Sequence, residues 1–333
     1  MDESLDNSEA EEPAGEPMAT SEGQKEFPCA QCGAKMAFDP TAKAIKCPYC
    51  AHETPIPQSA EDIVELDFHA YLAELAESED TVEAVTVKCT ACAAETTLDP
   101  SVTADACAFC GTPIVAEGKS TRVIRPKGVL PFDVDRKTAL ETFRNWLASL
   151  WFAPTKLKML ARTESTRLQG IYIPHWTYDA DTTCFYEGER GEDYWDTETY
   201  TETEDGKTVT KTRRVRKTRW YHASGCVFDS FDDVLVLASR SLPKKLADAL
   251  EPWDLPNLQS FDESYLAGYK AEAYQVPLDE GFEEAKGIME GTIRGHIKQD
   301  IGGDHQRIHS FAVNHDNVTF KHVLLPIWIS SYR

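Results

Sequence analysis

Eight of the ten cysteines in this 333-residue chain fall into two clusters of identical spacing. Each cluster has the pattern Cys-x2-Cys, a gap of fourteen residues, and Cys-x2-Cys. This spacing is typical of a zinc ribbon, in which two tight turns present four thiolates to one tetrahedral Zn²⁺. We therefore predict two zinc ions per chain, one bound by Cys29, Cys32, Cys47 and Cys50 and the other by Cys89, Cys92, Cys107 and Cys110.

The second cluster repeats the first at an offset of sixty residues, which indicates an internal duplication. Asp39-Pro40 recurs as Asp99-Pro100 in the loop between the paired cysteines, and Asp-Pro favours a turn. Redox dithiols or disulfide clips are the alternatives to zinc, but two matching sets of four favour the metal. Each ribbon is expected to organise its own small fold, so that replacing Cys47 would unfold the first ribbon alone.

The turns that follow the cysteine pairs differ in one position. A glycine there eases the conformation that points backbone N–H groups at the sulfur. Gly33 and Gly111 supply it, whereas Ala51 and Ala93 do not, so we expect strain at the two alanines. Tyr49 and Phe109 occupy equivalent positions inside the turns, where an aromatic ring either packs on the metal loop or anchors a partner.

Composition restricts the classes of protein to which the chain can belong. No run of apolar residues is long enough for a membrane span, and the acidic amino terminus is unlike a signal peptide. Zinc-type cysteine usage without an export signal predicts a reducing cytoplasm. The net charge of −22 opposes non-specific attachment to polyanions.

The order of motifs predicts five segments. Residues 1–26 form a disordered acidic tail, 27–57 the first ribbon, 58–86 a helical linker with its helix at 63–78, 87–118 the second ribbon, and 120–333 a scaffold domain. Residues 27–119 carry fifteen acidic residues against five lysines and no arginine. Since lysine and arginine dominate phosphate binding, this charge disfavours nucleic acid as a ligand of the ribbons.

The scaffold has an α+β pattern with two long helices, expected at about 135–151 and 279–299. Asp133 or Asp135 would cap the first helix, whose apolar stripe includes Trp146. The second helix has a stripe expected to be buried, with Phe282, Met289, Ile293 and Ile297. Strands are expected at 123–132, 170–178, 182–188, 305–313 and 318–329, in an antiparallel sheet. Leu130-Pro131 before the first helix and Pro174-x-Trp176 after it recur as Val276-Pro277 and Pro326-x-Trp328, which suggests a second internal duplication.

Residues 192–219 predict a hairpin with an acidic first strand and a basic second strand. A turn at Asp205-Gly206 would set Glu204 opposite Lys207 and Glu198 opposite Arg213. The two strands would then neutralise each other across the hairpin. The alternative is a basic arm that binds phosphates.

Enzyme motifs are not found, and we predict that the chain is not an enzyme. Gly118-Lys119-Ser120 resembles the end of a phosphate loop, but Pro113 stands where that loop needs a glycine. Cys184 and Cys226 have no histidine at ligand spacing and are expected to be small buried residues. The remaining candidates for a metal or acid–base site are Asp304, His305, His309, His315 and His322.

Further motifs extend along the chain after the two ribbons: Leu130-Pro131-Phe132, Trp151–Pro154, Gly170–Tyr178, Tyr186-x-Gly188-x-Arg190-Gly191, Trp253–Leu255, Tyr265–Gly268, Asp300–Asp304 and Leu324–Trp328. As a set they resemble an uncharacterised bacterial double zinc-ribbon family. Its members are often labelled primosomal protein N′ (replication factor Y), superfamily II helicase-like, or TFIIB-type zinc-ribbon proteins. Similar proteins are encoded beside phage-shock-protein-A-like and SPFH membrane-stress proteins.

The helicase label requires a phosphate loop, an acidic Mg²⁺-binding motif and two parallel motor sheets, none of which the sequence contains. The resemblance instead implies a non-enzymatic zinc-binding adaptor that contacts phage-shock-protein-A-like or SPFH-type proteins, in the cytoplasm and peripheral to the inner face of the membrane. Alternatives are a nucleic-acid-associated ribbon protein of replication or transcription and, third, an enzyme of unknown type. A basic face would favour the former, and a pocket of convergent polar groups the latter.

Overall fold

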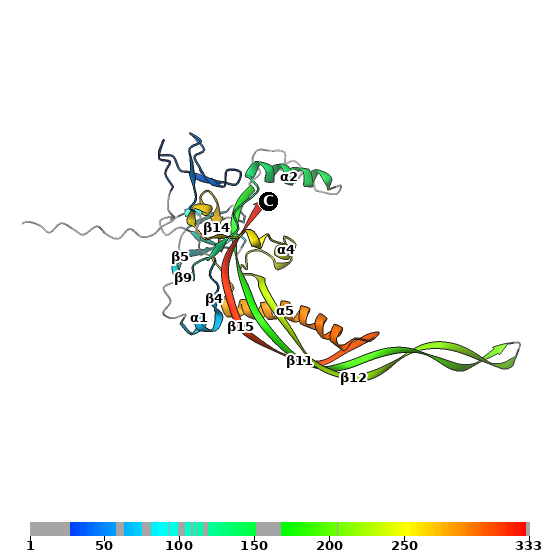
Figure 1. The fold of residues 1–333 in the computed structure, drawn as a ribbon. Helices are drawn as coiled ribbons and strands as arrows, with labels where there is room; N and C mark the ends of the chain where they lie inside the picture. The colour runs from blue at the N-terminus through cyan, green and yellow to red at the C-terminus, as the bar shows by residue number, and fades with distance from the viewer. Residues whose placement is uncertain are drawn as a thin grey trace, which may run out of the picture.

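The computed structural model describes residues 27–57, 63–74, 81–92, 94–98, 104–107, 109–110, 112–115, 119–150, 168–204 and 206–330. The predicted acidic tail, 1–26, lies outside them. The described fold is mixed α+β and consists mostly of sheet (Figure 1). No helix in these residues is both long and apolar enough to span a membrane.

A seven-stranded sheet forms the scaffold, and its main path runs β12-β11-β15-β10-β13. The long strands β11 (Leu168–Glu204), β12 (Lys207–Leu237) and β15 (His305–Ser330) are antiparallel. Short strands complete it: β10 (Gly128–Val129), β13 (Gln259–Ser260), β14 (Lys270–Ala271) and β4 (Leu66–Asp67). Strand β10 pairs with β15 in parallel, and β14 pairs with β11 in parallel. The sheet is therefore mixed, whereas the sequence predicted an antiparallel sheet.

Several breaks expected from the sequence are bulges within continuous strands. The strands predicted at 170–178 and 182–188 are one strand, whose pairing with β12 shifts between Tyr178 and Ala180. The strands predicted at 305–313 and 318–329 are likewise one strand, and Asn317 there adopts a positive φ of 52°. A bulge accommodates one extra residue without ending the pairing, so polar residues that suggested a turn remain inside the sheet. The strand expected at 123–132 is instead divided between β9 (Lys119–Ile124) and β10.

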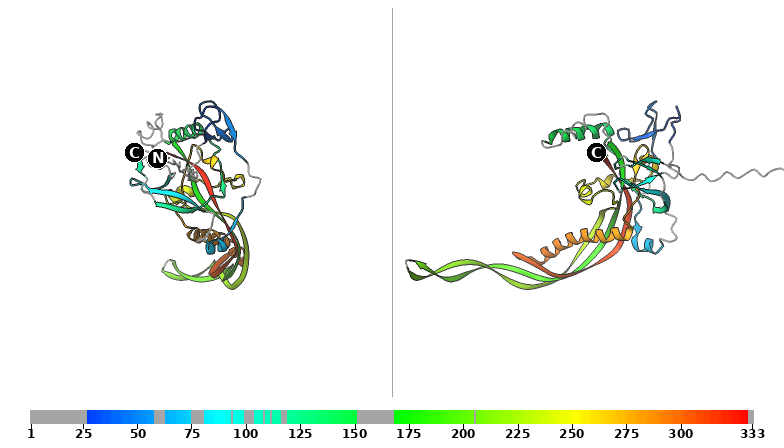
Figure 2. Two further views of the ribbon diagram at one scale, coloured as in Figure 1. Left: turned by 90° about the vertical axis from the view of Figure 1, so that its left-hand side faces the viewer. Right: turned by 180° about the vertical axis from the view of Figure 1, so that it is seen from behind.

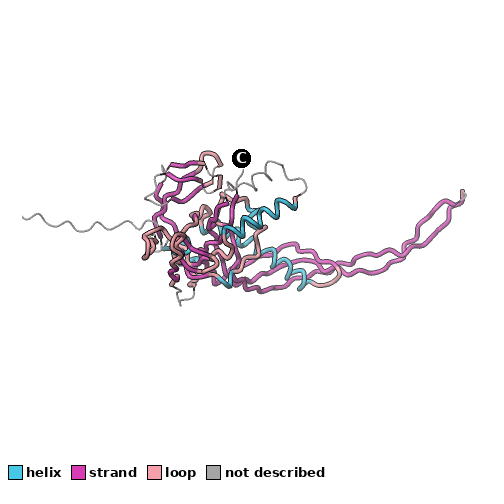
Figure 3. The backbone as a smooth tube through the Cα atoms, turned by 90° about the horizontal axis from the view of Figure 1, so that it is seen from above, coloured by secondary structure: helices cyan, strands magenta, loops and turns pink. Residues whose placement is uncertain are grey.

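The hairpin has the predicted register, with Glu204 opposite Lys207 and Glu198 opposite Arg213. It is the end of the much longer β11–β12 pair and projects away from the body (Figures 1 and 3). Pairing of β11 with β15 ends at Gly191 and His305, so residues 192–219, which we call the arm, are two-stranded. At about 3.3 Å per residue, the arm is roughly 40 Å long.

The two faces of the arm differ in chemistry because side chains alternate along a strand. One face carries ion pairs, including Lys217 with Asp196 at 2.8 Å and Arg213 with Glu198 at 3.3 Å. The other face carries threonines directly opposite one another: Thr199 with Thr212, Thr201 with Thr210, and Thr203 with Thr208. Cross-strand charge pairs and β-branched residues favour a ribbon that has no core of its own. The structure thus supports mutual neutralisation of the strands.

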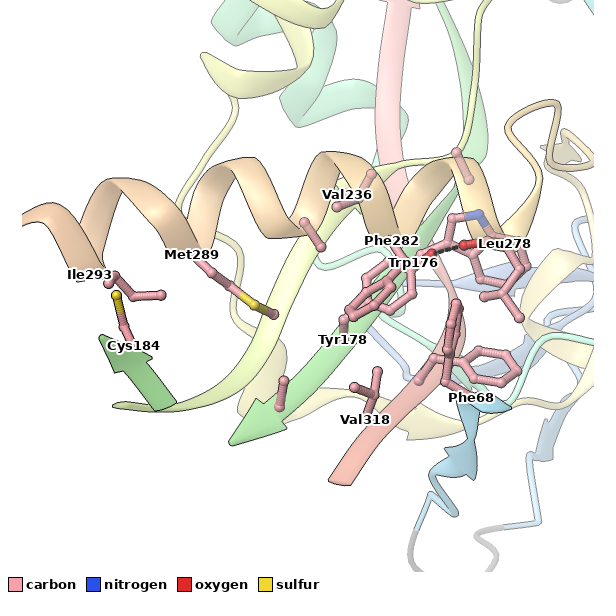
Figure 4. Close-up of a cluster of buried hydrophobic side chains, with 14 of the residues drawn as sticks. Phe68, Trp176, Tyr178, Cys184, Val236, Leu278, Phe282, Met289, Ile293 and Val318 are labelled. Atoms are coloured by element: carbon pink, nitrogen blue, oxygen red, sulfur yellow. Dashed lines mark hydrogen bonds between the residues drawn. The ribbon is translucent and has the colours of Figure 1, made fainter. Parts of the chain in front are cut away.

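Helix α5 (Leu278–Ile301) covers one face of the sheet with the buried stripe that its sequence predicts (Figures 2 and 4). Phe282, Met289, Ile293 and Ile297 are each at most 4% exposed. Two hydrogen bonds hold the start of the helix: Tyr178 Oη donates to Leu278 O at 2.6 Å, and Trp176 Nε1 donates to Val276 O at 3.0 Å. Phe68 joins the same cluster from α1 (Phe68–Glu74).

The other helices are shorter. Helix α2 (Arg136–Ser149) has 14 residues against 24 in α5, so the expectation of two long helices is met only in part. Asp135 caps α2 as predicted, by accepting from Thr138 N at 2.8 Å, but Trp146 on its expected apolar stripe is 54% exposed. The helix expected at 63–78 is replaced by β4 and α1 (Phe68–Glu74), and 75–78 lie outside the described residues. Short turns complete the scaffold: α4 (Lys244–Asp248), η1 (Leu255–Asn257) and η2 (Glu263–Leu266).

Contacts across the sheet support the second duplication. Trp176 on β11 bonds the carbonyl of Val276, just before α5. Its counterpart Trp328 on β15 donates to Val134 O at 3.1 Å, just before α2. Strand β10 of the first half pairs in parallel with β15 of the second half, and β14 of the second half pairs in parallel with β11 of the first half. Each half therefore contributes a tryptophan that hydrogen-bonds the backbone just before the helix of the other half.

Two buried histidines lead to a prediction about pH. The rings of His175 and His322 are 4% and 3% exposed, and burial lowers the pKa of each to about 4. The unfolded chain binds protons at these groups from about pH 6.5 downward, so the free energy of unfolding falls between pH 6.5 and 4. At pH 5 the loss is about 2 kcal/mol per histidine.

The substitution His322→Asn removes one titration and retains a side-chain N–H for the carbonyl of Ile124, which accepts from Nδ1 at 2.8 Å. Urea unfolding at pH 7.5 and pH 5 should show a smaller pH dependence for this variant. His309→Asn, at a surface position, serves as the control. An unchanged pH dependence in His322→Asn contradicts the assignment.

Candidate metal centres

The first ribbon is a three-stranded sheet of β1 (Ala37–Asp39), β2 (Ala44–Lys46) and β3 (Glu53–Pro55). Gly33 follows the first cysteine pair with φ +73° and donates its N–H to Cys29 O. Ala51 adopts the same left-handed conformation at φ +58° and donates to Cys47 O. This conformation is costly for a residue with a Cβ, so the strain expected at Ala51 is present. Ala93 and Gly111 lie outside the described residues.

The sulfurs of each cluster converge as a metal site requires. In the first ribbon Cys29 Sγ lies 3.4 Å from Cys50 Sγ, and Cys32 Sγ lies 3.5 Å from Cys47 Sγ. The corresponding distances in the second ribbon are 3.6 Å and 3.7 Å. Four sulfurs at about 2.3 Å from a tetrahedral Zn²⁺ are roughly 3.8 Å apart, whereas a disulfide needs about 2.05 Å. Both clusters therefore fit a tetrahedral metal ion rather than disulfides, as predicted for zinc.

Electrostatics in the first cluster also favour a bound cation. Backbone N–H groups of Cys50 and Tyr49 point at Cys47 Sγ and lower the pKa of that thiol to about 6. The N–H of His52 acts in the same direction on Cys50, but the neighbouring sulfurs and burial raise the pKa of Cys50 to about 12. Four thiols this close cannot all ionise without compensating positive charge. A divalent soft cation such as Zn²⁺ supplies that charge.

The second ribbon repeats the backbone of the first. Cys29 N and Cys47 N donate to the carbonyls of residues 34 and 52; Cys89 N and Cys107 N donate to those of residues 94 and 112. Its strands are β5 (Thr81–Lys88), β6 (Glu95–Leu98), β7 (Ala104–Ala106), β8 (Pro113–Val115) and β9. Because β5 pairs with both β6 and β9, residues 81–86 of the expected linker belong to the sheet of this ribbon.

The first ribbon shares a core with the scaffold. Its buried side chains, including Phe38, cluster with Phe132, Tyr172 and Tyr265. Phe38 N donates to Ala267 O at 2.9 Å, and the Phe38 ring meets Tyr265 edge-on at 5.4 Å. The ribbon is therefore not a free module, and we expect its unfolding to expose part of the scaffold core.

The second ribbon packs on the opposite face of the sheet. Phe109 contacts the small core of its own ribbon and also the cluster that contains Ile171 and Ile173. Tyr172, between these isoleucines, contacts the first ribbon, and adjacent residues of a strand point to opposite faces. Phe109 thus packs, whereas its counterpart Tyr49 is 82% exposed.

The histidines near the end of the chain do not form one site. His305 Nε2 lies 3.1 Å from both carboxylate oxygens of Asp193, and His309 Nε2 lies 3.4 Å from Glu189. His322 is buried far along the same strand, and His315 contacts the ring of Phe282. Asp304 accepts from Asp193 N at 2.8 Å and helps to fix the base of the arm. The spacing along an extended strand separates residues that are close in sequence.

The two remaining cysteines lie outside the ribbons. Cys184 is fully buried and Cys226 half-buried, so the expectation for Cys226 is met in part.

A cluster of Glu65, Asp179 and Asp232, which the sequence did not indicate, could also converge on a cation. The Lys321 ammonium lies beside it, 3.1 Å from Glu65, and provides the positive charge. Gly118 of the apparent phosphate loop lies outside the described residues.

Zinc content and its removal test the two centres. We expect two zinc ions per chain by elemental analysis, and one after Cys47→Ser. Because the first ribbon shares its core with Tyr172 and Tyr265, this variant should also lower the melting temperature of the scaffold, by about 10 °C. Cys107→Ser makes the corresponding change in the second ribbon and serves as the matched variant for Cys47→Ser. One zinc or fewer in the unmodified protein, or an unchanged scaffold transition in Cys47→Ser, contradicts this picture.

Comparison with known proteins adds a relative but no assigned activity. No protein-family model matches the chain. The chain is similar to "Uncharacterized protein YdjG" of Bacillus subtilis (strain 168), with 28% identity over 231 residues. The match covers 67% of this chain and 61% of that protein. No solved structure matches.

Proposed function

We propose that the chain is a non-enzymatic zinc-binding adaptor in which the ribbons stabilise the scaffold and the arm contacts protein partners. The observation that carries the proposal is that the ribbons pack on the sheet, whereas the arm projects away from it. Both ribbons place apolar side chains against the sheet, one on each face. The arm extends beyond helix α5 and strand β15, and both faces of this two-stranded segment remain accessible to a partner.

The arm has side chains suited to protein contact. Trp195 is 61% exposed and lies beneath the guanidinium of Arg214, whose carbon is 5.5 Å from the ring centroid. Tyr194 and Tyr200 on the other face are each 38% exposed. Tryptophan, tyrosine and arginine are the residues that most often contribute large binding energies at interfaces. A ribbon fixed at one end also presents them at a distance from the acidic body.

The identity of the partners rests on the family resemblance. It favours phage-shock-protein-A-like or SPFH-type membrane-stress proteins, and hence a cytoplasmic protein recruited to the inner face of the membrane by them. The absence of catalytic motifs in the sequence supports an adaptor rather than an enzyme.

A nucleic-acid-associated role is the second candidate. Arg214 and Arg216 beside Trp195 combine cations with a stacking surface, as single-strand binders do. Arg216, however, pairs with Asp193 at 3.1 Å. The overall charge of −22 further opposes phosphate binding.

Shortening the arm tests the adaptor proposal. Removal of residues 195–216, with Asn-Gly joining Tyr194 to Lys217, preserves the observed cross-strand pair and supplies a two-residue turn. We expect unchanged zinc content and melting temperature, but loss of co-purification with the membrane-stress proteins and loss of their membrane recruitment. An arm-shortened protein that still binds these partners, or an intact protein that never does, argues against the proposal.

Assays of nucleic-acid binding and ATP hydrolysis separate the two candidates. Acidic ribbons repel phosphates, so fluorescence anisotropy with single- and double-stranded oligonucleotides should give dissociation constants weaker than about 1 μM at roughly 150 mM salt. ATP hydrolysis should not exceed background. Nanomolar binding at that salt concentration, or hydrolysis abolished by a substitution in this chain, would reverse the order of the candidates.

A further inference from the structure

An open pocket lies at the base of the arm, where helix α5 ends against the sheet. Its volume is about 680 Å³, within the range of small-ligand sites. Strands β11 and β12 and the last turn of α5 contribute its lining. The side chains that define its chemistry are Tyr186, Arg190, Glu192, Tyr221, His222 and Asp300.

Two sequence motifs that have no role in the zinc sites meet in this pocket. Tyr186 and Arg190 belong to the motif on β11, and Asp300 begins the motif at the end of α5. Tyr186 Oη donates to Asp300 Oδ2 at 2.6 Å. A Cβ at Gly225 would lie 2.7 Å from that carboxylate oxygen and 2.8 Å from Tyr186 Oη. The contact between the motifs therefore requires a glycine on the neighbouring strand.

Charge in the pocket is unbalanced toward negative. Arg190 pairs with Glu192 at 2.7 Å, so these two side chains neutralise each other. Asp300 has no cationic partner among the residues that the structure describes, and its hydrogen bond comes from neutral Tyr186. Asp300 also lies in the last turn of α5, where the helix dipole adds negative potential. Burial and the neighbouring carboxylate raise the pKa of Tyr186 to about 12, so it remains a donor.

A tyrosine side chain lines the same pocket as this carboxylate. Tyr221 is 45% exposed and lines the same pocket. A carboxylate without a cation and a tyrosine face together suit an ammonium or guanidinium group, which gains a charge-assisted hydrogen bond and a cation–π contact. An anion would face Asp300 directly, and an apolar group would leave it desolvated.

We propose that the pocket binds a cationic side chain, lysine or arginine, of the protein partner that the arm contacts. The partner class rests on the adaptor function proposed above. A partner lying along the arm would insert one basic side chain where the arm meets the body, with Asp300 as its counter-ion and Tyr221 beside it.

Titration with small probes tests the pocket in the full-length, zinc-loaded protein. The probes are L-arginine amide, L-lysine amide and, as a neutral isostere, L-citrulline amide, followed by NMR of the Ile301 methyl group that lines the pocket. We expect saturable shifts with the arginine and lysine probes and about tenfold weaker binding in Asp300→Asn, which can still accept from Tyr186. Equal response to citrulline amide, equal affinity in Asp300→Asn, or no response to the cations overturns the proposal.

Two further variants separate this inference from the adaptor function. Glu141→Gln removes an exposed charge on helix α2, which does not line the pocket, and should leave probe binding unchanged. The arm-shortened protein retains every residue that lines the pocket, so it should bind the probes while losing the membrane-stress partners. If Asp300→Asn keeps full partner affinity, the pocket proposal fails and the adaptor function stands. If the partners never bind but the probes do, the adaptor function fails, the identity of the ligand as a partner side chain fails with it, and only cation binding remains.

Discussion

The antiparallel pairing of β11 with β15 is the constraint on which the rest of the structure depends. It extends from Leu168 opposite Ser330 to Gly191 opposite His305 and places two sequence-distant halves in one sheet. Because side chains alternate, Tyr172 contacts one zinc ribbon while Ile171 and Ile173 contact the cluster reached by the other. A shift by one residue would exchange the two faces, so both ribbons depend on this register.

The ribbons illustrate how small units with candidate metal sites contribute to a larger fold. Each has too few apolar residues to be stable by burial alone, and a metal ion bound by its four cysteines would fix its turns. Once fixed, the first ribbon presents Phe38 to Tyr265 and the second presents Phe109 to the far side of the sheet. Folding of the first ribbon and stability of the scaffold are therefore physically linked through their shared core.

The arm shows a different solution to the same shortage of core. A two-stranded ribbon is marginally stable in water, and here cross-strand ion pairs and facing threonines supply the stabilisation. Its base is held more firmly, since Asp193 accepts from Thr218 Oγ1 at 2.7 Å and also contacts His305. The result is a projecting element fixed in direction at one end and accessible along its length.

The sequence by itself determined the features that depend on local spacing. These are the two four-cysteine clusters that could hold a metal ion, the register of the hairpin at Glu204 and Lys207, and the buried stripe of α5, because cysteine spacing, turn chemistry and helical periodicity are short-range properties. Only the tertiary structure decided that polar residues around Asn317 form a bulge, since a neighbouring strand maintains the pairing. It also decided that the ribbons occupy opposite faces and that Tyr186 meets Asp300, because these contacts join residues far apart in the chain, and no local pattern encodes them.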